Sequence, residues 1–360
     1  MQKGRAKHVF PGAITPQGFF SYYSYIIDLE TAYKTVVIKG GPGVGKSTFM
    51  KKIGSEMQDR GFDIEYMHCS SDNNSLDGVV IPKLGYAFLD GTAPHVVDPK
   101  YPGAVDEIIN FGEFWNEDGI REHKDEVIHD SKAATQFFTR AYKFLKAAWA
   151  VYEDSAVING WALEKGKLNA LAMELINELF GEKPAADVEG KQRRLFGSAI
   201  TPDGFRNYLD SVLDQRRVYE IKGGLATGED ILLDKINNAA IERGYYVEAY
   251  FCPLNPNKIE HLVIPGLDIS FMTSNAYHSA SVPKYIIIDI KQYQKKDILD
   301  KYNDDLIQNH EEFDNLLSIA LLSVSRAKAV HDRLETYYVP NIDFNAINKC
   351  LEKTLSGLPK

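Results

Sequence analysis

An eight-residue stretch of the first hundred residues has the spacing of a phosphate-binding loop. Residues 40–47 read Gly-Gly-Pro-Gly-Val-Gly-Lys-Ser and fit the pattern G-x-x-x-x-G-K-[ST]. Glycines let consecutive backbone N–H groups turn toward a phosphate chain, and the helix that follows directs its positive dipole end there. Lys46 supplies a cation for the β- and γ-phosphates, and the Ser47 hydroxyl can ligate Mg²⁺. The pattern predicts binding of Mg²⁺ with ATP or GTP at Gly40, Gly41, Pro42, Gly43, Val44, Gly45, Lys46, Ser47 and Thr48.

Four more residues are candidates for chemistry beside this loop. Asp90 ends the apolar run 86–89, where a carboxylate would hold Mg²⁺ through a water together with Ser47. Its rivals are Asp72 and Asp77, in a loop after the second predicted strand, at the sheet edge where ligands bind in open α/β folds. An ordinary turn is the alternative interpretation of that loop. The predicted catalytic set is Lys46, Asp90, Asp72, Asp77 and His95, the last three as candidates to orient an attacking group.

The chain contains two copies of one sequence unit. Residues 13–19, Ala-Ile-Thr-Pro-Gln-Gly-Phe, recur as 199–205 with one difference, and Ile-Lys-Gly-Gly at 38–41 recurs at 221–224. The second register also aligns Cys69 with Cys252 and His95 with His278. Such a long shared register indicates a tandem duplication of whole domains. The predicted division is a first domain over 1–181, a linker over 182–192 and a second domain over 193–360.

The second copy lacks the charged groups of the phosphate-binding loop. Glu229 stands where the first copy has Lys46, and Asp230 stands where it has Ser47. A carboxylate repels a phosphate by about 1 kcal/mol or more per pair at ~4 Å. Thr273 replaces Asp90, so the predicted metal ligand is lost together with the cation. We therefore expect the second copy to be a degenerate domain that binds no nucleotide in the usual way.

Hydrophobic patterns predict strands alternating with helices in both copies. β-Branched or apolar runs at 35–38, 62–67, 86–90 and 107–111 predict strands, as do 218–221 and 285–289. Phe49, Met50, Ile53 and Met57 share one face of a helix that ends at residue 61. Thr15-Pro16 and Thr201-Pro202 predict a helix N-cap followed by proline, and the remainder of each copy reads as long helix. The expected fold class is α/β, two tandem P-loop NTPase-type domains, each a parallel sheet with flanking helices.

Composition limits the classes of function. The 360 residues are 44% hydrophobic and 25% charged, with a net charge of −9, which disfavours nucleic acid as a partner. No run of apolar residues is long enough for a membrane span, and no secretory signal is recognisable at the N-terminus. Three cysteines without CxxC spacing argue against a disulfide framework and against a zinc site. We expect a cytoplasmic protein with no membrane partner.

The motifs resemble those of the P-loop NTPase superfamily. More narrowly, the chain is similar to a bacterial family of tandem P-loop ATP-binding proteins described as predicted ATPases or nucleotide kinases. The resemblance extends over nearly the whole chain and is carried by the segments 40–48, 68–72 with 75–78, and 90–95. It implies ATP binding at Lys46, Ser47 and Thr48. Glu229 and Asp230 depart from a protein with two symmetric ATP sites.

Two hypotheses of function follow from these patterns. In the first, the chain is an enzyme that binds Mg-ATP in the first domain and passes the γ-phosphoryl group to water or to a small-molecule acceptor. In the second, it is a nucleotide-gated switch or assembly factor with little turnover, and the degenerate copy is a surface for a protein partner. ATP turnover separates the two.

Overall fold

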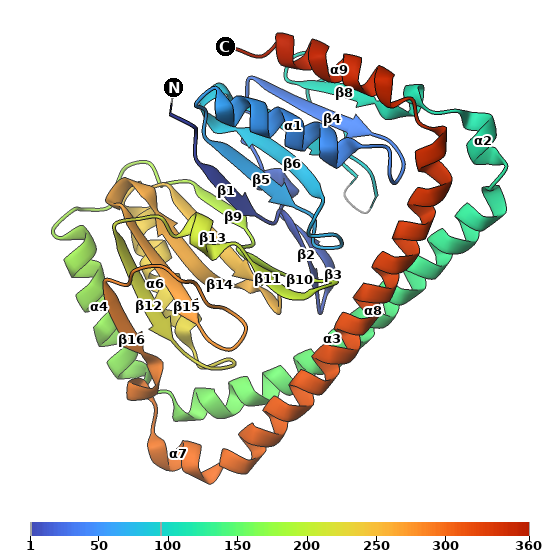
Figure 1. Cartoon of the computed structure of the whole chain (residues 1–360). Coiled ribbons are helices and arrows are strands. Elements are labelled where there is room, and N and C mark those ends of the chain that lie inside the picture. The colour runs from blue at the N-terminus through green and yellow to red at the C-terminus, as the bar shows by residue number, and fades with distance from the viewer. Residues whose placement is uncertain (1, 94–95, 360) are drawn as a thin grey trace.

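The computed structural model describes residues 2–93 and 96–359. Most strands in that part of the chain belong to two six-stranded sheets with the same strand order (Figure 1). In order across the first sheet lie β1 (Ala6–Val9), β5 (Ile64–His68), β6 (Leu76–Ile81), β7 (Tyr86–Asp90), β4 (Lys34–Lys39) and β8 (Asp106–Asn110). Their counterparts in the second sheet are β9 (Gln192–Leu195), β13 (Val247–Cys252), β14 (Asn255–Ile264), β15 (Ile269–Ser274), β12 (Arg217–Lys222) and β16 (Ile286–Asp289). The repeated order agrees with the duplication read from the sequence.

Both sheets are mixed, so the expectation of purely parallel sheets is wrong. β4 pairs in parallel with β7 and β8, and β1 pairs in parallel with β5, whereas β6 runs antiparallel to both of its neighbours. In the second sheet, β14 has the same antiparallel position. The connections on either side of β6, residues 69–75 and 82–85, are too short for a crossover helix, which needs a dozen or more residues. The chain can therefore only turn back there.

The two Thr-Pro segments form hairpin turns and not helix starts, which corrects the sequence prediction. One hairpin joins β2 (Gly12–Thr15) to β3 (Gly18–Ser21), and the other joins β10 (Ser198–Thr201) to β11 (Gly204–Asn207). The Thr15 hydroxyl donates to the Gly18 carbonyl oxygen at 2.8 Å, and Gly18 has a φ of +102°. Proline followed two residues later by glycine suits a tight turn, because proline fixes φ and glycine accepts a left-handed backbone.

The helices include two that follow the glycine loops and two that are much longer than the rest. α1 (Lys46–Asp59) and α6 (Glu229–Glu242) begin where the loops end. The predicted buried face of α1 is confirmed, since Phe49, Met50, Ile53 and Met57 are all buried. The other helices are α2 (Glu117–Arg121), α3 (Lys124–Ala162), α4 (Lys165–Phe180), α5 (Leu209–Val212), α7 (Lys296–Lys301), α8 (Asn303–Tyr338) and α9 (Phe344–Ser356). Short 3-10 turns occupy Tyr23–Tyr25, Pro82–Leu84, Phe111–Phe114, Pro265–Leu267, Ile290–Tyr293 and Val339–Asn341.

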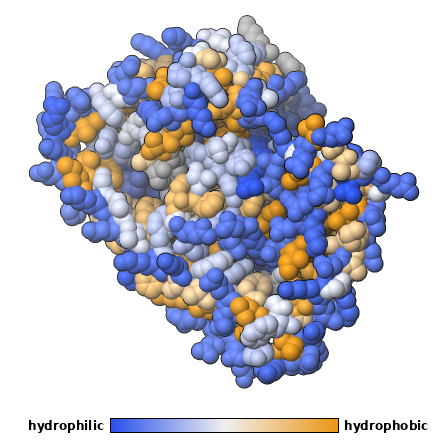
Figure 2. Space-filling model, turned by 180° about the vertical axis from the view of Figure 1, so that it is seen from behind, coloured by the Kyte–Doolittle hydropathy of each residue, from blue (hydrophilic) through white to orange (hydrophobic). Residues whose placement is uncertain are grey.

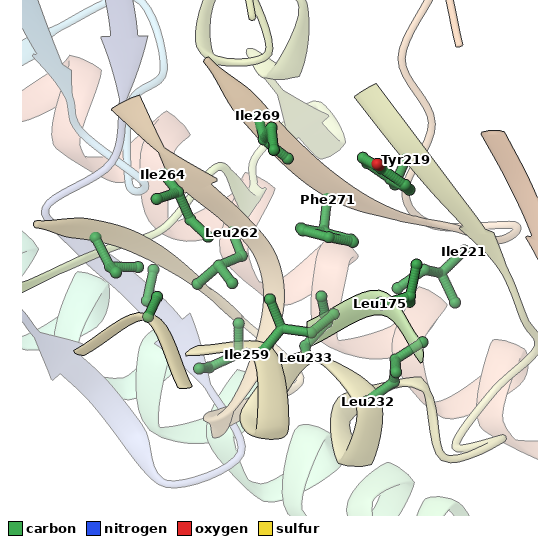
Figure 3. Close-up of a cluster of buried hydrophobic side chains, with 14 of the residues drawn as sticks. Leu175, Tyr219, Ile221, Leu232, Leu233, Ile259, Leu262, Ile264, Ile269 and Phe271 are labelled. Carbon is green, nitrogen blue, oxygen red and sulfur yellow. The ribbon is translucent and has the colours of Figure 1, made fainter. Parts of the chain in front are cut away.

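The last helix of each copy packs on the sheet of the other copy. α3 and α8 lie against each other and extend along one side of the molecule from the first sheet to the second (Figure 1). α4 then covers the second sheet, where Leu175 joins Ile221 and Leu232 in one hydrophobic core (Figure 3). α9 returns to the first sheet, where Ile347 and Leu351 join the core of α1. The predicted linker at 182–192, whose last residue begins β9, lies between the copies in sequence, but each unit in space contains a helix from the other copy.

This exchange of helices predicts which unit a core substitution destabilises. Leu351→Ala, in α9, and Leu168→Ala, in α4, should each cost about 2–5 kcal/mol, because both side chains are buried. By hydrogen–deuterium exchange, Leu351→Ala should speed amide exchange in β4–β7, and Leu168→Ala should speed it in β12–β15. Faster exchange of the second sheet in Leu351→Ala would contradict the exchanged arrangement.

Two buried glutamates and two partly buried cations join the two sheets where β1 and β9 approach each other. Arg193 Nη2 lies 2.7 Å from Glu65 Oε2, and Lys7 Nζ lies 2.9 Å from Glu248 Oε2. The crossed contacts, Lys7 to Glu65 and Arg193 to Glu248, measure 3.5 and 3.7 Å. Both carboxylates are therefore paired with cations from β1 and β9, which explains why a glutamate occupies the same position in both copies.

The pairing of Glu65 predicts a loss of stability in acid. Burial alone would raise the pKa of Glu65, but Arg193 and Lys7 outweigh it and hold the pKa well below its ordinary value of 4.5. The stabilisation is thus complete above about pH 4.5 and declines as the pH falls toward the folded-state pKa. Urea denaturation should give a free energy of unfolding that falls from pH 5 to pH 3, less steeply in Glu65→Gln. The exposed Glu56→Gln serves as a control and should keep the full slope.

The surface gives no sign of a membrane-spanning element in the described part of the chain. No helix there combines the length and the apolar character needed to cross a bilayer. α3 and α8 are long enough, but both contain charged residues over most of their length. The face shown in Figure 2 is largely hydrophilic, with apolar residues in small scattered patches.

Candidate functional site

The predicted phosphate-binding loop connects β4 to α1 and opens on a cavity. β4 ends at Lys39 and α1 begins at Lys46, so residues 40–45 make the loop. Gly43 and Gly45 have φ values of +67° and +89°, a left-handed backbone that favours glycine. Gly45 is the N-cap residue of α1, and the loop and the first turn of the helix line the cavity together. The N-terminus of α1, with its unpaired N–H groups, therefore faces the cavity.

Lys46 and Asp90, two of the predicted site residues, lie close to each other over this loop. Lys46 Nζ donates to the carbonyl oxygens of Gly41 at 2.7 Å and Gly40 at 3.1 Å. The same Nζ lies 3.6 Å from Asp90 Oδ2, at the end of β7. The other Asp90 oxygen accepts from the backbone N–H and the hydroxyl of Thr92, at 2.9 and 2.6 Å. A cation and a carboxylate are thus both fixed at the edge of the cavity.

Ser47 and the two rival aspartates also line the cavity. The Ser47 hydroxyl oxygen accepts from the Leu76 N–H at 2.9 Å. Asp72 stabilises the turn that follows β5, because its carboxylate accepts a hydrogen bond from the Ser75 hydroxyl at 2.9 Å. The same carboxylate lies 3.5 Å from Lys328 Nζ. Asp77 is buried at 3% exposure and faces the cavity from β6. His95 lies outside the described residues.

Asp77 has two protonated neighbours. Burial, followed by the charge of Asp77, raises the pKa of the Tyr23 hydroxyl and of the Cys69 thiol far above their usual ranges. Both groups are therefore neutral at physiological pH and face a carboxylate. A thiol in this state is a poor nucleophile, so Cys69 acts here as a packed polar neighbour.

The cavity has a volume of about 880 Å³, within the range of small-molecule sites. Its far wall is formed by α3 and α8, and α8 belongs to the second copy. Lys328, His331 and Glu335 of α8 face the loop, together with apolar and hydroxyl side chains of α3. Sequence reasoning missed this wall, because only the exchange of helices brings α8 to the first unit. The α3 residues are Ser131, Ala134, Thr135, Phe138, Thr139 and Tyr142.

The C-terminal end of α8 also touches the loop itself. A Cβ atom on Gly41 would come within 2.8 Å of the Tyr338 ring, and one on Gly43 within 3.1 Å of Glu335 Cβ. The loop thus lies in direct contact with an element of the second copy. A side chain at Gly41 would force the Tyr338 ring to shift, and one at Gly43, whose left-handed φ favours glycine, would crowd Glu335.

The second copy keeps the backbone of the loop but not its charges. Gly228 has a φ of +95°, and Ala226, at the position equivalent to Gly43, has a φ of +57°. Glu229 is fully buried; its Oε1 lies 2.7 Å from Lys258 Nζ, and its Oε2 accepts from the Thr227 hydroxyl at 2.9 Å. Because carboxylate and ammonium satisfy each other, this position offers no free cation to a phosphate.

No protein-family model matches the chain, and neither a curated protein nor a solved structure gives a significant match. Membership of the P-loop NTPase superfamily therefore stays a prediction from the motifs.

Proposed function

We propose that the first unit binds Mg-ATP and hydrolyses it. The observation that supports this proposal is the position of Lys46, the first residue of α1. Its ammonium group donates to two loop carbonyls and lies 3.6 Å from the Asp90 carboxylate. Phosphate oxygens attract the same ammonium group, and the N-terminus of α1 adds backbone donors. GTP would meet the same groups, since none of them contacts a base.

The side chains at the loop would have different roles in such a site. Lys46 would neutralise charge that develops on the β- and γ-phosphates. Ser47 and Asp90 offer the oxygen ligands that Mg²⁺ requires, and the bound ion would supply further positive charge to the phosphates. Asp72 lies on the same cavity, where a carboxylate can orient a water molecule by accepting its proton in a hydrogen bond.

Hydrolysis requires no other co-substrate than water. The water oxygen forms a bond to the γ-phosphorus, and the bond from that phosphorus to the bridging oxygen breaks. ADP leaves with the electron pair, and the water proton passes to the released phosphate or to solvent. Lys328 and His331 of α8 extend the polar lining of the cavity beyond the loop. These side chains could bind a small phosphoryl acceptor in place of water.

Calorimetry of Mg-ATP with the full chain tests the proposal. The wild type should bind one nucleotide per chain, and Lys46→Ala should bind at least ~10²-fold more weakly, because it removes a charge-assisted contact to two phosphates. Phosphate release measured in parallel should fall with binding. Two sites per chain, or undiminished binding by Lys46→Ala, would overturn the assignment of the first loop as the nucleotide site.

One observation favours a nucleotide-gated switch as the second candidate. Tyr338, Val339 and Glu335 of the second copy rest against the loop, so a ligand that moves the loop also acts on α8. A ligand shifts such an equilibrium only by its difference in affinity for the two states. A change in the radius of gyration on adding Mg-ATP, with negligible phosphate release, would support the switch over the enzyme.

A further inference from the structure

Three side chains of different ligand types meet in the interior of the second unit. Cys252 ends β13, Glu260 lies in β14, and His278 lies in the segment that follows β15. All three are buried, at 4%, 1% and 1% exposure. One ligand atom of each lies within 4.8 Å of those of the other two. A thiol, a carboxylate and an imidazole form a donor set that suits a transition metal ion.

The histidine ring is oriented as a metal ligand would be. His278 Nε2 lies 3.7 Å from Cys252 Sγ and 3.6 Å from Glu260 Oε1. Tetrahedral zinc, with bonds of about 2.0–2.3 Å, separates such ligand atoms by roughly 3.3–3.6 Å. The other ring nitrogen, Nδ1, lies 3.2 Å from the Ser198 hydroxyl. When Nδ1–H donates to that hydroxyl, Nε2 carries no proton and can bind a metal.

The local charges leave Glu260 short of a partner. Lys258 Nζ lies 2.7 Å from Glu229 but 3.9 Å from Glu260. Neither oxygen of Glu260 accepts a hydrogen bond of normal geometry from a described residue, although a buried carboxylate needs one. The group of Glu229, Lys258 and Glu260 has one excess negative charge. A divalent ion with a Cys252 thiolate would bring the buried group to neutrality.

In the first copy, the buried carboxylate at the equivalent position has a hydroxyl group as its partner. Asp77 occupies the position of Glu260, and the Tyr23 hydroxyl faces it. The position of Tyr23 is taken in the second copy by Leu209, which has no hydroxyl. A bound cation would give the Glu260 carboxylate the close partner that Tyr23 gives Asp77.

A bulge in β14 adds a further unpartnered group beside the three ligands. Tyr250 pairs with His261 and Phe251 with Ile259, so Glu260 is the extra residue in the strand. His261 is 1% exposed, neither of its nitrogens has a hydrogen-bond partner in the described structure, and its ring centroid lies 5.7 Å from that of His278. Bulges often re-aim side chains at sites. A water in the fourth position, usual in three-ligand zinc sites, would place a polar partner near His261.

We propose that Cys252, Glu260 and His278 bind a divalent transition metal ion of the zinc class inside the second unit. The ion would be acquired during folding, because the ligands are buried, and would stabilise the degenerate copy. The sequence analysis argued against a zinc site because no two cysteines have CxxC spacing. That criterion does not detect a site in which a carboxylate and a histidine, distant in sequence, join a single cysteine. This site is independent of nucleotide binding in the first unit.

Metal analysis of the untagged full chain, expressed with zinc in the medium, tests the proposal. The wild type should retain about one zinc per chain, and the Co²⁺-substituted protein should show thiolate-to-cobalt charge-transfer absorption. Cys252→Ser and His278→Gln should bind at least 10-fold more weakly. Cys69→Ser, at the equivalent position of the first copy, should keep both the zinc and the absorption band.

The wild-type measurements decide the question even if a variant fails to fold. Circular dichroism and elution volume show which variants are folded. A wild type that retains no zinc and gives no charge-transfer band with Co²⁺ would overturn the proposal. So would a folded Cys252→Ser with the full metal content, or loss of the band in Cys69→Ser alone.

Discussion

Glu229→Ala should lower the free energy of unfolding by about 1–3 kcal/mol, the cost of leaving buried donors without their acceptor, because Glu260 remains as an anion 3.9 Å from Lys258. Glu229 is fully buried and Lys258 is almost so, with 2.7 Å between Oε1 and Nζ. Removal of the carboxylate leaves the ammonium without its closest anion and the Thr227 hydroxyl without its acceptor. Urea denaturation followed by circular dichroism measures the loss.

A second substitution separates the lost contacts from the packing around them. Glu229→Gln keeps an oxygen acceptor for Lys258 and for the Thr227 hydroxyl, and should recover part of the lost stability. Loss of the exposed pair between Lys296 and Asp300, by Lys296→Ala, should cost at most about 1 kcal/mol. A Glu229→Ala variant as stable as the wild type would show that Lys258 is hydrated or finds another anion.

Local sequence signals were sufficient for the elements around the loop. A β-branched run, a glycine loop and an amphipathic helix predict β4, the loop and α1, and the structure has all three. The same reasoning failed at Thr15-Pro16, because proline after a capping residue suits a helix start and a turn equally. Gly18 decides between them, since a left-handed residue three positions after Thr15 closes a hairpin.

The far wall of the cavity could not be predicted in the same way. Lys328 and His331 lie in a helix of the second copy, about 280 residues from Lys46 in sequence. Nothing in a local pattern states which sheet a terminal helix covers, because α4 and α9 would bury an apolar face equally well on either one. Duplication makes this choice especially open, since the two sheets offer nearly equivalent surfaces.

The degenerate loop shows which features of the repeat belong to the fold. Ala226 keeps a left-handed φ of +57° at the position of Gly43, although alanine is strained there. The loop backbone is therefore maintained by its surroundings, including the Leu225 carbonyl, which accepts from Asn159 Nδ2 at 3.1 Å. The charges, by contrast, differ completely between the copies, which supports the proposal that Lys46 and Asp90 carry the chemistry.

Asp90→Asn should weaken Mg-ATP binding and turnover by about 10–100-fold while it changes Mg-free ATP binding much less. The asparagine carbonyl can still accept from Thr92, so the end of β7 should keep its structure. What disappears is the negative charge 3.6 Å from Lys46 Nζ, which is also the charge expected to hold Mg²⁺ through a water. Calorimetry with and without Mg²⁺, together with phosphate release, measures both effects.

The matched control and the rival carboxylate make this result decisive. Asp98→Asn removes an exposed carboxylate that pairs with Lys39 in the same region, and it should leave binding and turnover unchanged. Asp72→Asn should lower turnover more than binding if Asp72 orients the attacking water, because that contact matters in the transition state. If instead Asp72→Asn abolishes the Mg²⁺ dependence and Asp90→Asn does not, Asp72 is the metal ligand. Asp90 would then act only by holding Lys46 over the loop.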